Sequence, residues 1–123
     1  MAKNIKILAF SLVVVLFLSN CSNDDDNLNQ IEFGIWISTD KTDTLDFKTQ
    51  NNFYKSNAFM QNDNYDYKLL PKDSIQIGYR GKLFILVEPT NHKYSIEKNE
   101  LTIDFTNQSC YGFDDEIMTY IKE

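Results

Sequence analysis

The chain has 123 residues and carries 18 Asp and Glu against 12 Lys and Arg, a formal net charge of −6, with a pI near 4.7. This length allows one small domain at most. The acidic balance argues against nucleic acid as a partner, because phosphate binding depends on clustered basic side chains. One His and two Cys leave most metal centres and catalytic triads without enough ligands or bases.

Residues 1–20 have the composition of a secretion signal. Lys3 and Lys6 precede residues 7–18, which are apolar except for Ser11, and this order is what the secretion machinery reads. A helix over these twelve residues reaches about 18 Å, short of the roughly 30 Å hydrocarbon core of a bilayer. We therefore expect a signal peptide that is cleaved, and no transmembrane anchor afterwards.

The apolar run ends in Leu18-Ser19-Asn20-Cys21. This stretch resembles the lipobox of bacterial lipoproteins, which implies that Cys21 receives a diacylglyceryl group and becomes the first residue after cleavage. Asn20 departs from the Gly or Ala that is usual at its position. An anchor of several acyl chains suffices for stable attachment to a membrane, since each buried methylene contributes about 0.8 kcal/mol.

Residues 21–30 form the expected tether. Ser22 to Asn27 include three consecutive Asp and no apolar side chain, a composition that stays solvated and outside a core. The acidic start after the cysteine resembles the head of surface lipoproteins of Bacteroidota, where it acts as an export signal. The resemblance implies a lipid anchor in the outer membrane and display at the cell surface. A periplasmic position, with the acidic run as a plain spacer, is the alternative.

The acidity belongs to the mature domain, because cleavage removes two Lys and no acidic residue. Ten basic and 18 acidic residues remain, a net charge of −8. With Cys21 lipidated, Cys110 is the one remaining thiol, so no intramolecular disulfide is expected. No basic residue lies beside Cys110, which favours a buried apolar role at a strand end over a reactive thiol.

Residues 31–123 form the expected folded domain. Apolar and polar side chains alternate there, and no long window keeps apolar residues at helical spacing, a pattern that predicts short strands joined by turns. In chain order the expected strands are 31–38, 45–48, 53–57, 65–69, 74–80, 83–87, 94–96, 101–105 and 117–121.

The short connections force sequential strands to pair antiparallel. Such a meander removes its exposed edges most simply by closing on itself. We therefore expect an all-β fold, a small antiparallel up-and-down barrel of about eight strands. A two-sheet β-sandwich is the alternative, and residues 106–116 are long enough to supply the arch that it needs.

The first expected strand carries Gly34-Ile35-Trp36, with the only Trp of the chain. It resembles the Gly-x-Trp motif of lipocalins and other calycins, whose Trp closes the bottom of the barrel. Residues 34–122 are similar in arrangement to the short lipocalin-like domains of Bacteroidota lipoproteins. The resemblance implies a lipocalin-like barrel with Gly34 and Trp36 at its closed end. The last strand has no Arg to cover this Trp, since Arg80 is the only Arg.

The side chains expected inside the barrel are mostly large. Eight strands enclose a space that such side chains can just fill, so we expect a packed core and no capacious cavity. Four tyrosines are candidates for ligand contacts at a barrel mouth: Tyr65, Tyr67, Tyr79 and Tyr94. The expected inward positions are Leu45, Phe47, Phe53, Tyr65, Tyr67, Leu69, Ile75, Ile77, Tyr79, Leu83, Ile85, Val87, Tyr94, Ile96, Leu101, Ile103, Phe105 and Ile117.

Some apolar residues fall on the opposite face. Phe84 and Leu86 share one expected strand and could form a docking patch with Tyr54 or Tyr120. Cover by residues 106–116 is the alternative. Met60 and Leu70 complete the apolar residues of this face.

No motif for catalysis or metal binding stands out. His92 lies in a turn without a nucleophile motif, so a surface histidine is favoured over a general base. Carboxylates cluster at Asp40 with Asp43, at Asp63 with Asp66, and at 114–116. None has the pattern of a calcium loop, so solvated turns are expected, with no metal and no cofactor.

These observations predict a non-enzymatic, membrane-anchored surface lipoprotein. It would bind a small molecule, a glycan or an envelope protein through its barrel mouth or loops. The alternative is an inhibitor that presents Asp114, Asp115 and Glu116 to a cationic envelope-directed enzyme such as lysozyme, because small acidic envelope lipoproteins resemble lysozyme inhibitors in size and charge. An enzyme is the least favoured hypothesis.

Overall fold

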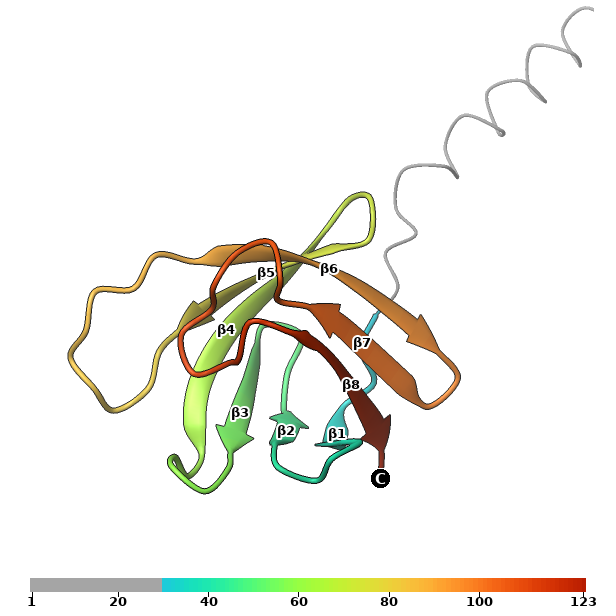
Figure 1. Ribbon diagram of the computed structural model, residues 1–123, viewed down its shortest axis with the longest axis horizontal. Coiled ribbons are helices and arrows are strands. Elements are labelled where there is room, and N and C mark those ends of the chain that lie inside the picture. Colours follow the sequence, from blue (N-terminus) through green and yellow to red (C-terminus); the bar gives the residue numbers. More distant parts are fainter. Residues whose placement is uncertain (1–29) are drawn as a thin grey trace, which may run out of the picture.

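The computed structural model describes residues 30–123, which form an all-β domain with no helix (Figure 1). The expected signal peptide, Cys21 and all but the last residue of the tether lie outside the described residues. The strands are β1 (Gly34–Ser38), β2 (Thr44–Phe47), β3 (Asn52–Ser56), β4 (Asp63–Leu70), β5 (Ser74–Tyr79), β6 (Thr90–Glu97), β7 (Glu100–Asp104) and β8 (Ile117–Lys122).

Each strand pairs antiparallel with the next, and β8 pairs with β1, so the sheet closes on itself. This confirms the predicted up-and-down barrel of eight strands. Closure satisfies the backbone groups that an open meander would leave at its two edge strands. Within residues 30–123, no helix has the length and apolar character needed to cross a bilayer.

The loops divide between the two ends of the barrel because sequential strands run in opposite directions. The long-loop end carries residues 39–43, 57–62, 80–89 and 105–116, whereas the closed end carries the turns 48–51, 71–73 and 98–99. In Figure 1 the loop 80–89 projects to the left, away from the turns 71–73 and 98–99. Residues 30–33 join β1 at the closed end, so the chain enters opposite the long loops.

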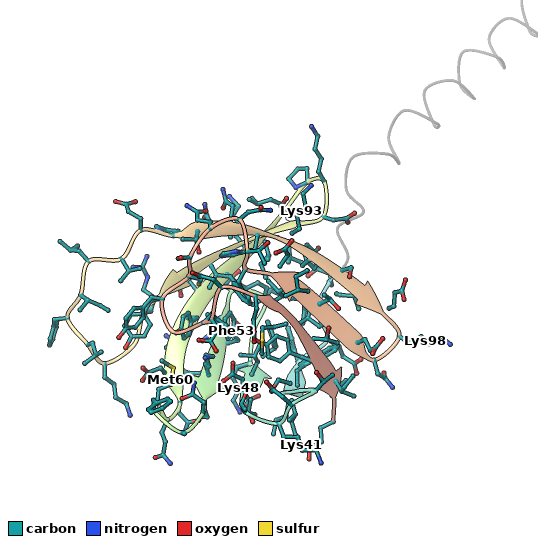
Figure 2. The ribbon with its side chains drawn as sticks, in the orientation of Figure 1. Lys41, Lys48, Phe53, Met60, Lys93 and Lys98 are labelled. Atoms are coloured by element: carbon teal, nitrogen blue, oxygen red, sulfur yellow. The ribbon has the colours of Figure 1, made fainter. Side chains whose placement is uncertain are left out.

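The interior is filled by aromatic rings. Phe53, labelled inside the barrel in Figure 2, lies between Phe47 and Tyr65, with ring centroids 5.0 and 5.1 Å away. Such ring pairs add about 0.5–1.5 kcal/mol each beyond their buried area. The buried apolar side chains are Ile31, Trp36, Leu45, Phe47, Phe53, Tyr65, Tyr67, Ile75, Ile77, Tyr79, Tyr94, Leu101, Ile103, Phe105, Cys110, Phe113, Met118 and Tyr120.

The expected strand at 83–87 is wrong, because residues 80–89 form a loop. Leu83 and Ile85 are exposed, whereas Val87 is partly buried and packs against the core. The ladder between β5 and β6 stops where Ile77 pairs with Thr90. Pro89 precedes this pair and has no N–H to donate, so the chain leaves the sheet there. The strand β6 begins at Thr90, ahead of the expected strand 94–96.

The faces of the last strand are the reverse of those expected. Ile117 is 60% exposed, whereas Met118 and Tyr120 are buried, so Tyr120 takes no part in an outward patch. Met118 lies opposite Ile103 and Tyr120 opposite Leu101, and residues directly opposite in a sheet share a face. Of the remaining expected inward positions, Leu69 and Ile96 are partly buried against the core.

Candidate functional site

The closed end of the barrel is filled by Trp36. Its side chain is 1% exposed, and its Nε1 donates a hydrogen bond to the Glu32 carbonyl oxygen at 2.9 Å. Gly34 has a φ of +118°, a backbone conformation that L side chains rarely adopt. On β8, Lys122 stands opposite Trp36 in the register. These contacts give Gly34 and Trp36 a structural role at this end.

Tyr65 on β4 and Tyr79 on β5 lie side by side near the long-loop end, with ring centroids 5.3 Å apart. Tyr65 Oη donates to the Tyr111 carbonyl oxygen at 2.9 Å. Tyr79 Oη donates to Asp63 Oδ2 at 3.0 Å and accepts from the Leu83 amide at 3.4 Å. Burial raises the pKa of both hydroxyls, so both stay protonated at neutral pH, with partners inside the protein.

Tyr67 and Tyr94 lie toward the closed end. Tyr67 Oη donates to the Thr49 carbonyl oxygen, in the turn between β2 and β3, at 3.1 Å. The Tyr94 amide donates to the Asp73 carbonyl oxygen, in the turn between β4 and β5, at 2.9 Å. Burial, with the nearby Asp73 charge, raises the pKa of Tyr94. The structure therefore divides the four candidate tyrosines between the two ends and does not bring them to one mouth.

Residues 105–116, the cap loop, cover the interior at the long-loop end. Phe113 is 8% exposed and stacks on Phe105 with ring centroids 4.5 Å apart. Gly112 has a φ of +83°, which brings the loop backbone against the barrel. Cys110 is buried, as expected, although it lies in this loop and not at a strand end. Burial raises the pKa of its thiol, which keeps it protonated and poorly nucleophilic.

Lys55 on β3 points into the barrel, with its side chain 1% exposed. Its Nζ donates to the Gly112 carbonyl oxygen, lies 3.4 Å from Asp43 Oδ2 and sits 4.4 Å from the centre of the Phe113 ring. Sequence reasoning missed this residue. The signal was present, because the two-residue period of a strand places Lys55 on the same face as the buried Phe53.

An open cleft of about 770 Å³ lies beside this ammonium group, at the long-loop end. The loops 39–43 and 57–62 and residues 112–114 form its walls. The charged and aromatic side chains among its lining are Asp40, Lys41, Asp43, Lys55, Phe59, Phe113 and Asp114.

The carboxylate of Asp40 is held at the rim of this cleft. Its Oδ1 accepts from Ser38 Oγ at 2.6 Å and from the Thr42 hydroxyl and amide at 2.7 and 3.1 Å. These hydrogen bonds, that of Ser38 first, hold the pKa of Asp40 below its usual value. The group therefore stays ionised, and its second oxygen is free of these three contacts.

The neighbouring turn is set by Asn57. Its Nδ2 donates to Asp43 Oδ1 at 3.2 Å, and its Oδ1 accepts from the amides of Phe59 and Met60 at 2.8 and 3.0 Å. The turn leaves the Phe59 ring 96% exposed. The cleft thus combines the ionised Asp40 carboxylate with an exposed aromatic face.

Two of the predicted solvated carboxylates are instead nearly buried. Asp43 is paired with Lys55, and Asp63 accepts a hydrogen bond from the Tyr79 hydroxyl. Both are therefore parts of the core's polar contacts. Within the described part of the chain, no group of three His, Cys, Asp or Glu side chains is arranged to hold a metal ion.

The prediction of a surface histidine at position 92 is wrong. His92 is 3% exposed, on β6 and not in a turn. Its Nε2 lies 2.6 Å from Thr90 Oγ1, and its ring packs on Phe105 with centroids 4.7 Å apart. The burial arises because β6 begins earlier than expected, so that Thr90, His92 and Tyr94 share the inward face. Burial lowers the pKa of His92.

Compared with models of protein families, with curated proteins and with solved structures, the chain has no match. The function proposed for the cleft therefore rests on its own geometry.

Proposed function

We propose that this protein is a non-enzymatic lipoprotein of the outer membrane, anchored through Cys21 and displayed at the cell surface on a lipocalin-like barrel. It binds a glycan in the cleft at the long-loop end. The observation that carries the proposal is this open cleft of about 770 Å³, beside an interior that aromatic rings already fill. The ligand therefore binds at the loops and not inside the barrel.

The lining of the cleft suits a sugar. The exposed ring of Phe59 offers a flat apolar face to the C–H groups of a pyranose. Asp40 stays ionised and can accept hydrogen bonds from hydroxyl groups, as can Asp114 at the rim. A few fixed polar groups beside apolar surface are typical of sites for small ligands.

The position of the cleft fits display from a membrane. Residue 30 lies at the closed end, and Cys21 precedes it by a short acidic tether. An anchor at Cys21 would therefore leave the loops 39–43, 57–62 and 112–114 pointing away from the lipid surface.

The test is binding of the detergent-extracted full-length lipoprotein to an array of bacterial and host glycans. Phe59→Ala and Asp40→Asn should each weaken binding about tenfold, which corresponds to about 1.4 kcal/mol. Phe33→Ala is the matched control, because Phe33 is also exposed but lies at the closed end. Absence of any glycan binding, or binding that Phe59→Ala leaves unchanged, would refute the proposal.

Inhibition of a cationic enzyme is the second candidate. Asp114, Asp115 and Glu116 are all exposed, and Asp115 Oδ1 accepts from Ser109 Oγ at 2.9 Å. The burial of Phe113 next to them fixes the cap loop, so the acidic side chains need little ordering on binding. This arrangement favours electrostatic capture of a basic enzyme surface.

Lysozyme activity at low and high salt tests this candidate. Inhibition at low salt that fades at high salt, and that is lost on neutralising residues 114–116, is the expected result. Neutralising the exposed Glu97 and Glu100 at the closed end is the control. Unchanged lysozyme activity at low salt removes the candidate.

A further inference from the structure

The loop 80–89 presents apolar side chains to solvent. Phe84 and Leu86 are fully exposed, Leu83 is 55% exposed and Ile85 is 42% exposed. The loop projects beyond the barrel at the left of Figure 1. Contiguous exposed apolar side chains on a small domain often mark a site of contact with another molecule.

Few backbone groups of this loop are paired; one of them is the Leu83 amide, which donates to Tyr79 Oη at 3.4 Å. The ladder between β5 and β6 ends at Ile77 and Thr90, and within residues 82–88 one backbone–backbone hydrogen bond forms, from the Ile85 amide to the Leu83 carbonyl oxygen at 3.0 Å. Residues 81–83 form a bend, and residues 84–89 contain no bend or turn. The backbone groups that these contacts leave over can pair with another strand once the segment extends.

The sequence of the segment is complementary to itself. Residues 82–88 read Lys-Leu-Phe-Ile-Leu-Val-Glu, with a cation at one end, an anion at the other and five apolar residues between them. We propose that residues 82–88 pair antiparallel, about a two-fold axis at Ile85, with the same residues of a second copy of this chain. Such a contact is self-complementary and closes as a dimer.

This register accounts for each pair of side chains. Lys82 lies opposite Glu88 of the second copy, Phe84 opposite Leu86, and Ile85 opposite itself. Opposite charges and apolar pairs directly across antiparallel strands each contribute roughly 0.2–1 kcal/mol. Parallel pairing would place Lys82 against Lys82 and Glu88 against Glu88, which is destabilising. The charges therefore select the antiparallel arrangement.

Cross-linking in cells that express the full-length protein tests the pairing. In Ile85→Cys the two substituted positions face each other, with Cα atoms about 4.5 or 5.5 Å apart in an antiparallel pair, within disulfide range. Copper–phenanthroline oxidation should give a disulfide-linked dimer. Phe59→Cys lies at the same end but away from the axis and is more exposed than Ile85, 96% against 42%, and it should still give at least fivefold less dimer.

Charge reversal then tests the register. In the Ile85→Cys background, Lys82→Glu or Glu88→Lys alone should lower the dimer yield severalfold, because each places like charges opposite one another. Co-expressed with different tags, the two reversed chains should cross-link to each other, because the new carboxylate at position 82 then faces the new ammonium group at position 88. The unchanged Lys82 and Glu88 of the two chains also face each other in this pair. The exposed loop packs little against the core, so these changes should leave the fold intact.

Three results would overturn the proposal. One is a dimer yield for Ile85→Cys no higher than that for Phe59→Cys. Another is a yield that single charge reversal leaves unchanged or that co-expression does not restore. The third is a cross-link to a different envelope protein in place of the second copy.

Discussion

Lys55 is a buried ammonium group whose contacts explain why the core tolerates it. Burying a charge costs several kcal/mol unless it is paired and hydrogen-bonded. Lys55 has the Asp43 carboxylate, the Gly112 carbonyl oxygen and the face of Phe113. Two of these partners belong to the cap loop, so the charge also fixes the loop that seals the barrel.

Lys55→Met should lower the free energy of unfolding by about 3 kcal/mol, because it leaves Asp43 and the Gly112 carbonyl without their partner. Lys48→Met is the matched control: Lys48 pairs with Asp46 at 2.9 Å but is 58% exposed, so the loss should stay below about 1 kcal/mol. Urea denaturation measures both. Equal losses in the two variants would contradict the role assigned to Lys55.

His92 makes stability depend on pH. Burial holds the pKa of the folded imidazole below its ordinary value of 6.5, so in the window below 6.5 the unfolded chain binds more protons than the folded one. The free energy of unfolding should therefore fall as the pH drops from about 7 to about 5. The lowered pKa values of Asp40 and Asp104 act only below 3.8, their ordinary value.

His92→Gln should remove most of this slope, because the amide can keep a contact with Thr90 but does not titrate. Urea midpoints at several pH values give the measurement. Thr102→Val provides a control, since it removes a side-chain hydrogen bond with Thr119 at 3.2 Å and leaves the imidazole in place, so the slope should persist. A wild-type slope that persists in His92→Gln would exclude His92 as its source.

At the level of elements, the alternation of side chains predicted most of the barrel and its inward positions, but not which face of β8 turns inward. In β8, Ile117 and Ile121 are as apolar as Met118 and Tyr120, so local pattern cannot decide. The decision comes from the partner strand, where Leu101 and Ile103 already face the core. A register of this kind depends on contacts distant in the sequence.

Contacts distant in the sequence also determine the conformation of residues 83–87 and the formation of the cleft. The apolar run has strand composition, but Pro89 ends the ladder that would have held it. The cleft arises where the loops 39–43 and 57–62 meet residues 112–114, a meeting that only the closed barrel brings about. The burial of Trp36, by contrast, could be predicted from residue type alone, because large aromatic side chains are mostly buried.

The cap loop depends on Gly112. Its φ of +83° is strained for any other residue, and a Cβ there would overlap Tyr65 Oη. Gly112→Ala should cost at least about 1–2 kcal/mol of unfolding free energy and speed amide hydrogen exchange in residues 106–116. In Gly78→Ala, the new Cβ would lie 3.7 Å from Pro89 Cγ, an ordinary contact, so stability should change by less than about 0.5 kcal/mol. Similar exchange rates in both variants would show that Gly112 does not hold the loop.

For the whole molecule, the closed barrel separates an end with short turns from an end with long loops. Residues 30–33, Trp36 and the short turns occupy one end, and every long loop occupies the other. An even number of antiparallel strands places both ends of the described chain at the same end of the barrel. Attachment through Cys21 therefore implies that the cleft and the loop 80–89 face outward together.

The accessibility of single cysteines on intact cells tests this orientation. Phe59→Cys lies at the long-loop end, and Lys98→Cys lies in the turn between β6 and β7 at the closed end. Figure 2 labels Lys98 at the right. Met60, which follows Phe59 in the same loop, is labelled far from it at the lower left. A bulky membrane-impermeant maleimide should label Phe59→Cys several times faster, because an anchor at Cys21 would turn the closed end toward the lipid surface. Buried Cys110 should add little background. Replacing residues 1–21 with a signal peptide that is cleaved without lipidation should release the protein from the membrane and bring the two rates together, since both sites are then reached from bulk solvent. Faster labelling at residue 98 on intact cells would place the loops against the membrane and contradict the orientation.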